Sequence, residues 1–434
     1  MNKVFRADSI LTRHISLFLL IIISWGGGCL ALHADASEEN SGSTETMTEG
    51  VISELLPPGA NLWDVIGQEI TTLTASPISP LLGAGGFGAY KWWRADEATR
   101  ANLPWFSQPW FFIPALCLVL FCACKESLGT ILPPGFKKPL DAIEAVANKV
   151  AAIVAAVIFI PGTVNVLVKT IGQDAFGFDG NMTPVAGAEM STAGFATITV
   201  AAVDVTWILY PVISVLAVAA FFLVWMASHT INVLILLSPW GGIDLALKIF
   251  RTTCFASLLG IMVIDPRIAA VVSLVVIIIA YFIAGWSFRL TVFGSAFCWD
   301  FLTLRHLRFE LEENNNKLFC GRHGGAKTRT YGRLCNDTEK GRIVFTYRPW
   351  LILPRRKKVV EFSEPPYVAK GIFFSTVREG KITRFILPPR YIGQEEKFAQ
   401  LYGLSGGVKN AGLRWVLGSF LELFNGAIPQ EEAS

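Results

Sequence analysis

Polar residues that interrupt or end long apolar runs are the first candidates for chemistry in this sequence. A Pro-Gly pair at 161–162 lies inside one such run, and several polar residues follow it or stand at the ends of neighbouring runs. A helix broken at membrane depth frees backbone carbonyls that can coordinate an ion or a substrate. We therefore predict an ion or substrate path, with anchoring of helix ends as the alternative. Its candidate residues are Thr163, Asn165, Lys169, Asp204 and Arg267.

A second polar group follows the third apolar run. His229 and Asn232 are three residues apart, which places them on one helical face, and Asp244 and Lys248 have the spacing of an i,i+4 ion pair. Histidine changes its charge near neutral pH, so these four residues could form a proton-responsive gate. The structural interpretation is a polar clasp that fixes a helical hairpin.

Four consecutive cations form a third candidate site, Arg355, Arg356, Lys357 and Lys358. They precede a strand-like segment, and a cluster of one sign attracts anionic lipid headgroups or an acidic protein partner. A solvated basic face without a partner is the alternative.

Motifs of enzymes and metal sites are incomplete in this sequence. Cys320, His323 and Cys335 offer three zinc ligands without a clear fourth. The stretch at 321–328 lacks the last glycine of a phosphate-binding loop, and the Gly-x-Ser-x-Gly pattern at 403–407 follows a helix-like segment rather than a strand. We therefore expect no catalytic residue, no cofactor and no metal.

Composition sets the class of protein that carries these residues. Of its 434 residues, 52% are hydrophobic and 16% are charged, against about 25% charged in a typical soluble domain. This excludes a purely soluble enzyme and a disordered protein. Residues 301–434 hold 22 Lys and Arg against 13 Asp and Glu. The C-terminal third is therefore basic.

The N-terminus has the order of a secretory signal, with cations, a short apolar core and a small-x-small site ending at Ala36. We predict a signal peptide at 1–36. Lipidation at Cys29, or retention of the segment as a membrane anchor, is the alternative. An acidic extracytoplasmic segment follows at 37–104, with a flexible leader at 37–50 and an amphipathic helix at 61–73 that we expect on the outer membrane surface.

Five apolar stretches have the length of about 20 residues that crosses a bilayer. They lie at 105–124, 150–168, 205–227, 245–264 and 268–288. Basic residues gather in alternate connections, which places the N-terminus outside and the C-terminal domain in the cytoplasm. Three cations that precede the first stretch, Lys91, Arg94 and Arg100, argue for the inverted topology.

Beyond residue 293 the sequence resembles a water-soluble module. Strand-like segments occur at 342–353, 357–362, 371–378 and 381–387, with a tight hairpin at Glu379-Gly380. Helices are predicted at 394–402 and 410–425.

The predicted fold is an α-helical membrane bundle of about five spans at 105–293, followed by a small, basic α+β domain at 294–434, mostly antiparallel, with a C-terminal helix. We expect a bacterial inner-membrane protein that acts without catalysis as a scaffold or sensor, its cytoplasmic domain engaging anionic lipid or an acidic protein partner rather than nucleic acid. A channel or secondary transporter that uses the residues near the Pro-Gly pair is the alternative function.

Overall fold

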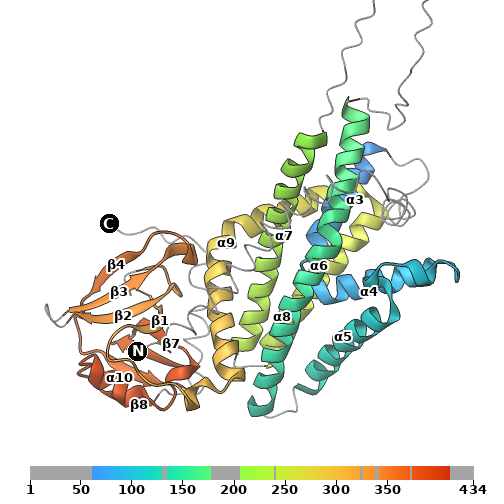
Figure 1. Ribbon diagram of the computed structural model, residues 1–434. Coiled ribbons are helices and arrows are strands. Elements are labelled where there is room, and N and C mark those ends of the chain that lie inside the picture. Colours follow the sequence, from blue (N-terminus) through green and yellow to red (C-terminus); the bar gives the residue numbers. More distant parts are fainter. Residues whose placement is uncertain are drawn as a thin grey trace, which may run out of the picture.

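The computed structural model describes residues 61–129, 134–176, 206–238, 241–322, 326–337, 342–371 and 374–410. The predicted signal peptide, the leader at 37–50 and all but the first residue of the predicted helix at 410–425 lie outside these ranges. The described residues form a helical bundle and a sheet domain, which lie side by side (Figure 1).

Four helices of the bundle are long and apolar enough to cross a membrane, which makes the chain a multi-pass membrane protein. They contain the predicted spans from the second to the fifth. Their bounds are α6 (Pro134–Phe176), α7 (Thr206–Leu237), α8 (Gly241–Ile264) and α9 (Pro266–Leu302).

The first predicted span, at 105–124, is corrected by the structure. Its first residues form the 3-10 turn η2 (Trp105–Ser107), and α5 (Pro109–Gly129) begins only at a proline. The apolar part of α5, Pro109–Cys122, covers about 21 Å at 1.5 Å per residue, against a hydrocarbon core of about 30 Å. The described part of the chain therefore holds four candidate spans rather than five.

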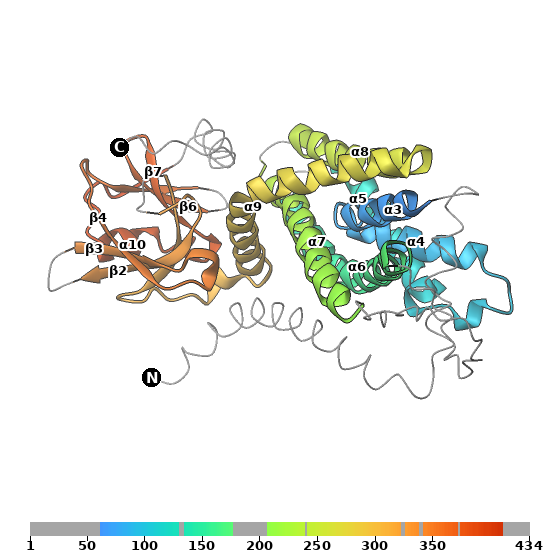
Figure 2. The same cartoon turned by 90° about the horizontal axis from the view of Figure 1, so that it is seen from above.

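The helix expected on the membrane surface is instead buried in the bundle. α3 (Leu62–Ala75) packs against α6, α7, α8 and α9, and Figure 2 shows it enclosed by these helices. Its Thr, Gln and Glu side chains form a polar face. The amphipathic pattern predicted that this face would contact water, but it packs against other helices. The Gly-rich segment that follows forms a second short helix, α4 (Pro80–Arg94), which packs against α5 and α6.

Two ion pairs mark the two ends of the bundle. Asp64 at the start of α3 pairs with Arg267 at the start of α9, and we call this end the α3 end. Glu144 on α6 pairs with Lys248 on α8 at the other end, which we call the sheet end. The chain passes from the α3 end to the sheet end through α3, α4 and α5, and the four long helices then alternate in direction. Asn61 and Leu302 therefore lie at opposite ends of the bundle.

The predicted break at 161–162 does not interrupt α6, which runs for 43 residues through Pro139 and Pro161. Proline removes one backbone hydrogen bond from a helix, and membrane helices tolerate this where neighbouring groups replace it.

The sheet domain contains one eight-stranded mixed sheet in the order β4-β3-β2-β1-β7-β6-β5-β8. All neighbours are antiparallel except β5 and β8, which are parallel. The strands are β1 (Asn316–Cys320), β2 (Tyr331–Asp337), β3 (Arg342–Tyr347), β4 (Arg356–Val360), β5 (Tyr367–Lys370), β6 (Ser375–Glu379), β7 (Ile382–Leu387) and β8 (Val408–Asn410). A core that includes Phe345, Phe385 and Phe398 joins the sheet to α10 (Glu395–Leu401).

Several sequence predictions for this domain are confirmed. The hairpin at Glu379-Gly380 joins β6 to β7, and Gly380 adopts a φ of 54°, which glycine tolerates without strain. The helix predicted at 394–402 is α10. The strand predicted at 342–353 ends at Tyr347, because Pro349 starts the 3-10 turn η4 (Pro349–Leu351).

The sheet domain packs directly on the last turns of α9. Phe293 on α9 stacks edge-on against Phe319 of β1 at 4.9 Å between ring centroids. The Arg390 guanidinium, in the 3-10 turn η5 (Pro389–Tyr391), reaches Asp300 on α9. α9 itself runs unbroken across position 293, where we placed the boundary between the two domains.

Candidate functional sites

The four consecutive cations lie on an edge of the sheet domain. Arg356, Lys357 and Lys358 belong to β4, Arg355 immediately precedes it, and all four side chains are exposed. β4 is the terminal strand of the sheet, with β8 at the opposite edge. Because side chains alternate along a strand, the patch presents positive charge on both faces of the edge.

An exposed apolar loop stands directly before this patch. Trp350 is 45% exposed, Ile352 is 66% exposed and Leu353 is 46% exposed. The Trp350 ring lies 4.7 Å from the ring of Phe288 on α9, close to Gly285. Trp350 and Leu351 both have positive φ, an uncommon conformation for residues with side chains. We call residues 349–353 the anchor loop.

Sequence reasoning missed the anchor loop because it extended the preceding strand to Leu353. The available signal was the apolar run between Pro349 and Pro354, which is too short for a span and is followed at once by cations.

The predicted path residues on α6 are only partly brought together. Thr163 is buried, whereas Asn165 and Lys169 on the same helix are partly buried. Asp204 lies outside the described residues. Arg267 lies at the α3 end, exposed on one side and bound to Asp64.

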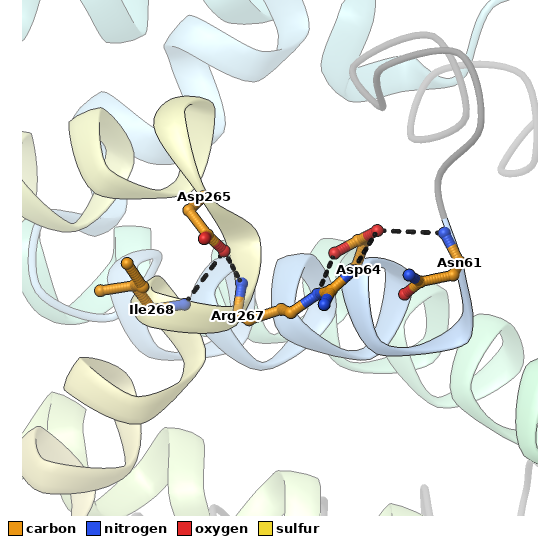
Figure 3. A network of polar contacts seen from close by, with 5 residues as sticks. All are labelled: Asn61, Asp64, Asp265, Arg267 and Ile268. Atoms are coloured by element: carbon orange, nitrogen blue, oxygen red, sulfur yellow. Dashed lines mark hydrogen bonds and ion pairs between the residues drawn. The ribbon is translucent and has the colours of Figure 1, made fainter.

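The contacts of Arg267 form a small network at the α3 end (Figure 3). Its Nε donates to Asp64 Oδ1 at 2.7 Å, and the Asn61 backbone N–H donates to Asp64 Oδ2 at 3.0 Å. The hydrogen bond from Arg267 and that from Asn61 hold the pKa of Asp64 below its usual value. Asp265 caps α9 by accepting the backbone N–H groups of Arg267 and Ile268. The network fixes the start of α3 against the start of α9.

The residue that sequence reasoning missed in this region is Glu69, on α3. It is fully buried, and among the described residues neither carboxylate oxygen has a hydrogen-bond partner. The polar group that acts on its carboxylate is the Thr163 hydroxyl. An acidic residue on a helix otherwise rich in apolar residues and threonine was the only signal in the sequence.

The predicted gate or clasp residues all lie in a polar cluster near the sheet end. The Arg251 guanidinium of α8 donates to the Asn232 side-chain oxygen of α7. Lys248 Nζ lies 2.8 Å from Glu144 Oε2 of α6. Asp244 is buried at the first turn of α8. The cluster thus ties α6, α7 and α8 together.

His229 lies within this cluster and is 2% exposed. Its ring stacks on that of Trp225 at 5.5 Å between centroids, and within the described ranges neither ring nitrogen has a hydrogen-bond partner. On the neighbouring helix α6, Lys149 Nζ donates to Ser295 Oγ of α9. The cluster therefore combines the Glu144–Lys248 ion pair with an imidazole that has no hydrogen-bond partner among the described residues.

The described residues include no group of three His, Cys, Asp or Glu side chains that could hold a metal ion. Cys320 is buried, its thiol directed at the carbonyls of Gly321 and Ala326, and His323 lies outside the described ranges. Comparison with protein-family models, with curated proteins and with solved structures finds no match to this chain.

Proposed function

We propose that this multi-pass protein acts as a scaffold or sensor in a bacterial inner membrane and docks its sheet domain on the anionic surface of that membrane. The observation that carries this proposal is the anchor loop, whose exposed apolar side chains lie beside α9 and lead directly into the basic edge strand.

The position of the anchor loop along α9 supports contact with the bilayer surface. Side chains of α9 from Ile268 to Phe282 include a series of strongly exposed apolar residues, the pattern of a lipid-facing helix. Trp350 contacts α9 at Gly285 and Phe288, just after this series ends. Tryptophan favours the headgroup level of a membrane because its ring is apolar and its N–H is polar. The anchor loop thus lies where α9 leaves the hydrocarbon core.

The charges of the adjoining patch match an anionic lipid surface. A cation close to such a surface contributes about 1 kcal/mol to binding. Apolar side chains and cations that act on the same segment give a stronger membrane attachment than either alone. We therefore favour anionic lipid over an acidic protein partner.

The arrangement of the bundle supports the proposed orientation, with the segment before α3 outside the cell and the sheet domain in the cytoplasm. Asn61 and Leu302 lie at opposite ends, and the cations Lys248, Arg251 and Arg289 lie toward the sheet end. Lys91, one of the three cations that argue for inversion, is buried and lies over the Phe87 and Phe106 rings. Because this lysine is buried in packing contacts, it is weak evidence for a cytoplasmic loop under the positive-inside rule.

Hydrogen exchange of the full-length protein in nanodiscs tests this proposal. We expect the amides of residues 349–353 to exchange at least tenfold more slowly in nanodiscs of equal parts phosphatidylcholine and phosphatidylglycerol than in phosphatidylcholine alone, a difference of about 1.4 kcal/mol. High salt should reduce the effect, because ions screen exposed charges.

Two triple variants distinguish an effect of the basic patch at β4 from an effect of the overall charge of the protein. Arg356→Glu, Lys357→Glu and Lys358→Glu together should abolish the lipid dependence. The matched control is Lys370→Glu, Lys381→Glu and Lys397→Glu, three exposed cations away from β4, and it should retain that dependence. Equal exchange in both lipids, or equal loss in both variants, refutes lipid docking.

A further inference from the structure

Two titratable side chains are buried in the bundle without hydrogen-bond partners, one in each half. Glu69 on α3 has a relative exposure of 0%, and His229 on α7 has one of 2%. Of the residues described, none makes a hydrogen bond of good geometry to either Glu69 oxygen or to either His229 nitrogen, and the Thr163 hydroxyl is the polar group that acts on Glu69. Ionisable groups inside membrane domains are costly, so they mark ion and proton pathways more often than structural positions.

Glu69 is held in the bundle by a helix that enters the membrane region without crossing it. α3 has 14 residues, a length of about 21 Å at 1.5 Å per residue. It begins at the Asp64–Arg267 pair and is followed by a turn at which the Ser228 hydroxyl of α7 donates to the Ile78 carbonyl. Ile78 packs in a core with Val224, Phe255 and Ala280 from the middle of three spans. α3 therefore ends inside the bundle, and the turn after it packs against the middle of three spans.

Further buried polar side chains lie between Glu69 and the sheet end. The Ser273 hydroxyl of α9 donates to the Thr71 hydroxyl at 3.3 Å. Thr74 on α3 and Ser76, the residue that caps the end of α3, follow, and both are buried. The Ser228 hydroxyl of α7, one residue before His229, then donates to the turn that follows α3. We call this series of side chains, from Glu69 to His229, the polar seam.

Beyond His229 the seam meets the ion pairs of the sheet end. Thr230 donates to the Ser287 carbonyl of α9, and Asn232 binds Arg251. The pair of Glu144 and Lys248 lies at the boundary. Polar groups thus extend from the Asp64–Arg267 pair to the Glu144–Lys248 pair through the interior of the bundle.

The surroundings of Glu69 favour a proton over a metal cation as its ligand. A sodium ion needs several oxygen ligands, whereas Thr163 supplies the polar group that acts on Glu69. Asp64, on the same helix, is bound to Arg267 of α9, and Lys169 lies further along α6. Burial without a neighbouring cation disfavours the charged carboxylate and so favours the neutral acid.

The surroundings of His229 likewise favour its neutral form. Lys149 on α6 and Arg251 on α8 act on it with like charge, and Trp225 stacks on its ring. Asn232 and Ser228 are the neighbouring polar residues on α7, and Ser287 and Ser295 lie on α9. A neutral imidazole can accept a proton on one nitrogen and release one from the other.

We propose that the polar seam conducts protons across the membrane, with Glu69 and His229 as its two relay groups. The neutral acid of Glu69 gives up its proton through the hydroxyls of the seam and intervening water, and the resulting carboxylate is then reprotonated from the α3 end. His229 accepts this proton on one nitrogen and releases a proton from the other toward the sheet end. Each cycle moves one proton and returns both groups to their neutral forms, without an oxidant, a cofactor or a covalent intermediate.

Proton flux into liposomes that contain the full-length protein tests the proposal. An internal pH-sensitive dye reports acidification after an external pH drop, with potassium and valinomycin to compensate the charge. The wild-type protein should acidify the lumen well above protein-free liposomes. Glu69→Gln, which keeps the size of the side chain, should lower this flux at least tenfold, and Glu69→Asp should restore part of it. His229→Gln should also lower the flux.

The matched control is Glu97→Gln, at an exposed acidic residue outside the seam, and its flux should equal that of the wild type. Infrared difference spectra give a second readout, because a carbonyl band of a protonated carboxyl group should be present in the wild type and absent in Glu69→Gln. A flux that Glu69→Gln leaves unchanged, a flux that requires sodium, or no flux above the lipid background overturns the proton path. None of these results depends on docking of the sheet domain.

Discussion

Arg390 Nε donates to Asp300 Oδ2 at 2.6 Å, and both side chains are buried, so an ion pair joins the last turns of α9 to the sheet domain. Removing one partner of a buried ion pair leaves the other charge uncompensated, at a cost of about 3 to 5 kcal/mol. We expect Arg390→Met or Asp300→Asn to loosen the sheet domain from α9, which limited proteolysis within residues 303–315 should detect.

The double variant Asp300→Leu with Arg390→Met is the control for this prediction. Apolar replacement of both partners is often neutral, so the protease resistance should largely return. If the effects of the two single variants on cleavage rate instead add in the double variant, each side chain stabilises the interface through its own contacts, and the ion pair itself does not.

Gly67 sets the distance between α3 and α9. A Cβ atom at this position would lie 2.4 Å from the Pro266 carbonyl oxygen, which is backbone and cannot rotate away. We expect Gly67→Ala to destabilise the bundle by about 1 to 3 kcal/mol, although alanine favours a helix over glycine by about 1 kcal/mol. Gly86→Ala, where the added Cβ meets no atom within 4 Å, should be neutral or stabilising. Thermal unfolding in detergent compares the two variants.

Glu379 should make the sheet domain sensitive to acid. Burial alone raises its pKa, but hydrogen bonds from Arg384 and from the Glu364 and Ser363 backbone N–H groups outweigh burial and lower the pKa below 4.5. Because the folded value is the lower one, the stabilisation is complete above about pH 4.5 and is lost as the pH falls through the folded value. Hydrogen exchange at Ser363 and Glu364 should show this loss.

Replacement of this carboxylate tests the same prediction. Glu379→Gln should weaken protection of these two amides by about 1 to 3 kcal/mol near neutral pH, and the difference from the wild type should vanish in acid. A difference that does not change with pH would contradict the role of the charge.

Thiol labelling tests the orientation of the chain in the membrane. In a cysteine-free background, Asn61→Cys lies at the α3 end and Lys397→Cys lies on the sheet domain, and both positions are exposed. A membrane-impermeant reagent should label the first in intact cells and the second only after permeabilisation. Labelling in the reverse order would place the sheet domain outside the cytoplasm.

The long spans could be predicted from the sequence because a continuous apolar run is a local property. The stretch at 105–124 is equally apolar, but a turn occupies its first residues and Pro109 starts a new helix, so hydropathy overestimated its helical length. For α3, an amphipathic pattern cannot distinguish a polar face in water from one packed against other helices. Glu69 was therefore placed at the surface, although it lies at the centre of the bundle.

Contacts between residues far apart in the sequence explain why the remaining features could not be predicted. The spacing of Asp244 and Lys248 suggested a local pair, but it could not show that Lys248 reaches Glu144 on α6, 104 residues away. The anchor loop became visible only once β3 was seen to end before Pro349. Whether the predicted residues form a gate, a clasp or a path depends on such long-range contacts.

α9 runs for 37 residues without interruption, and the sheet domain packs on its final turns. Membrane helices change their tilt when the thickness of the surrounding bilayer changes. Since α9 is one continuous helix, a change in the tilt of its apolar half would also move the attached sheet domain. If the sheet domain docks on lipid as proposed, the thickness of the host membrane would set the height and angle at which the basic edge meets it.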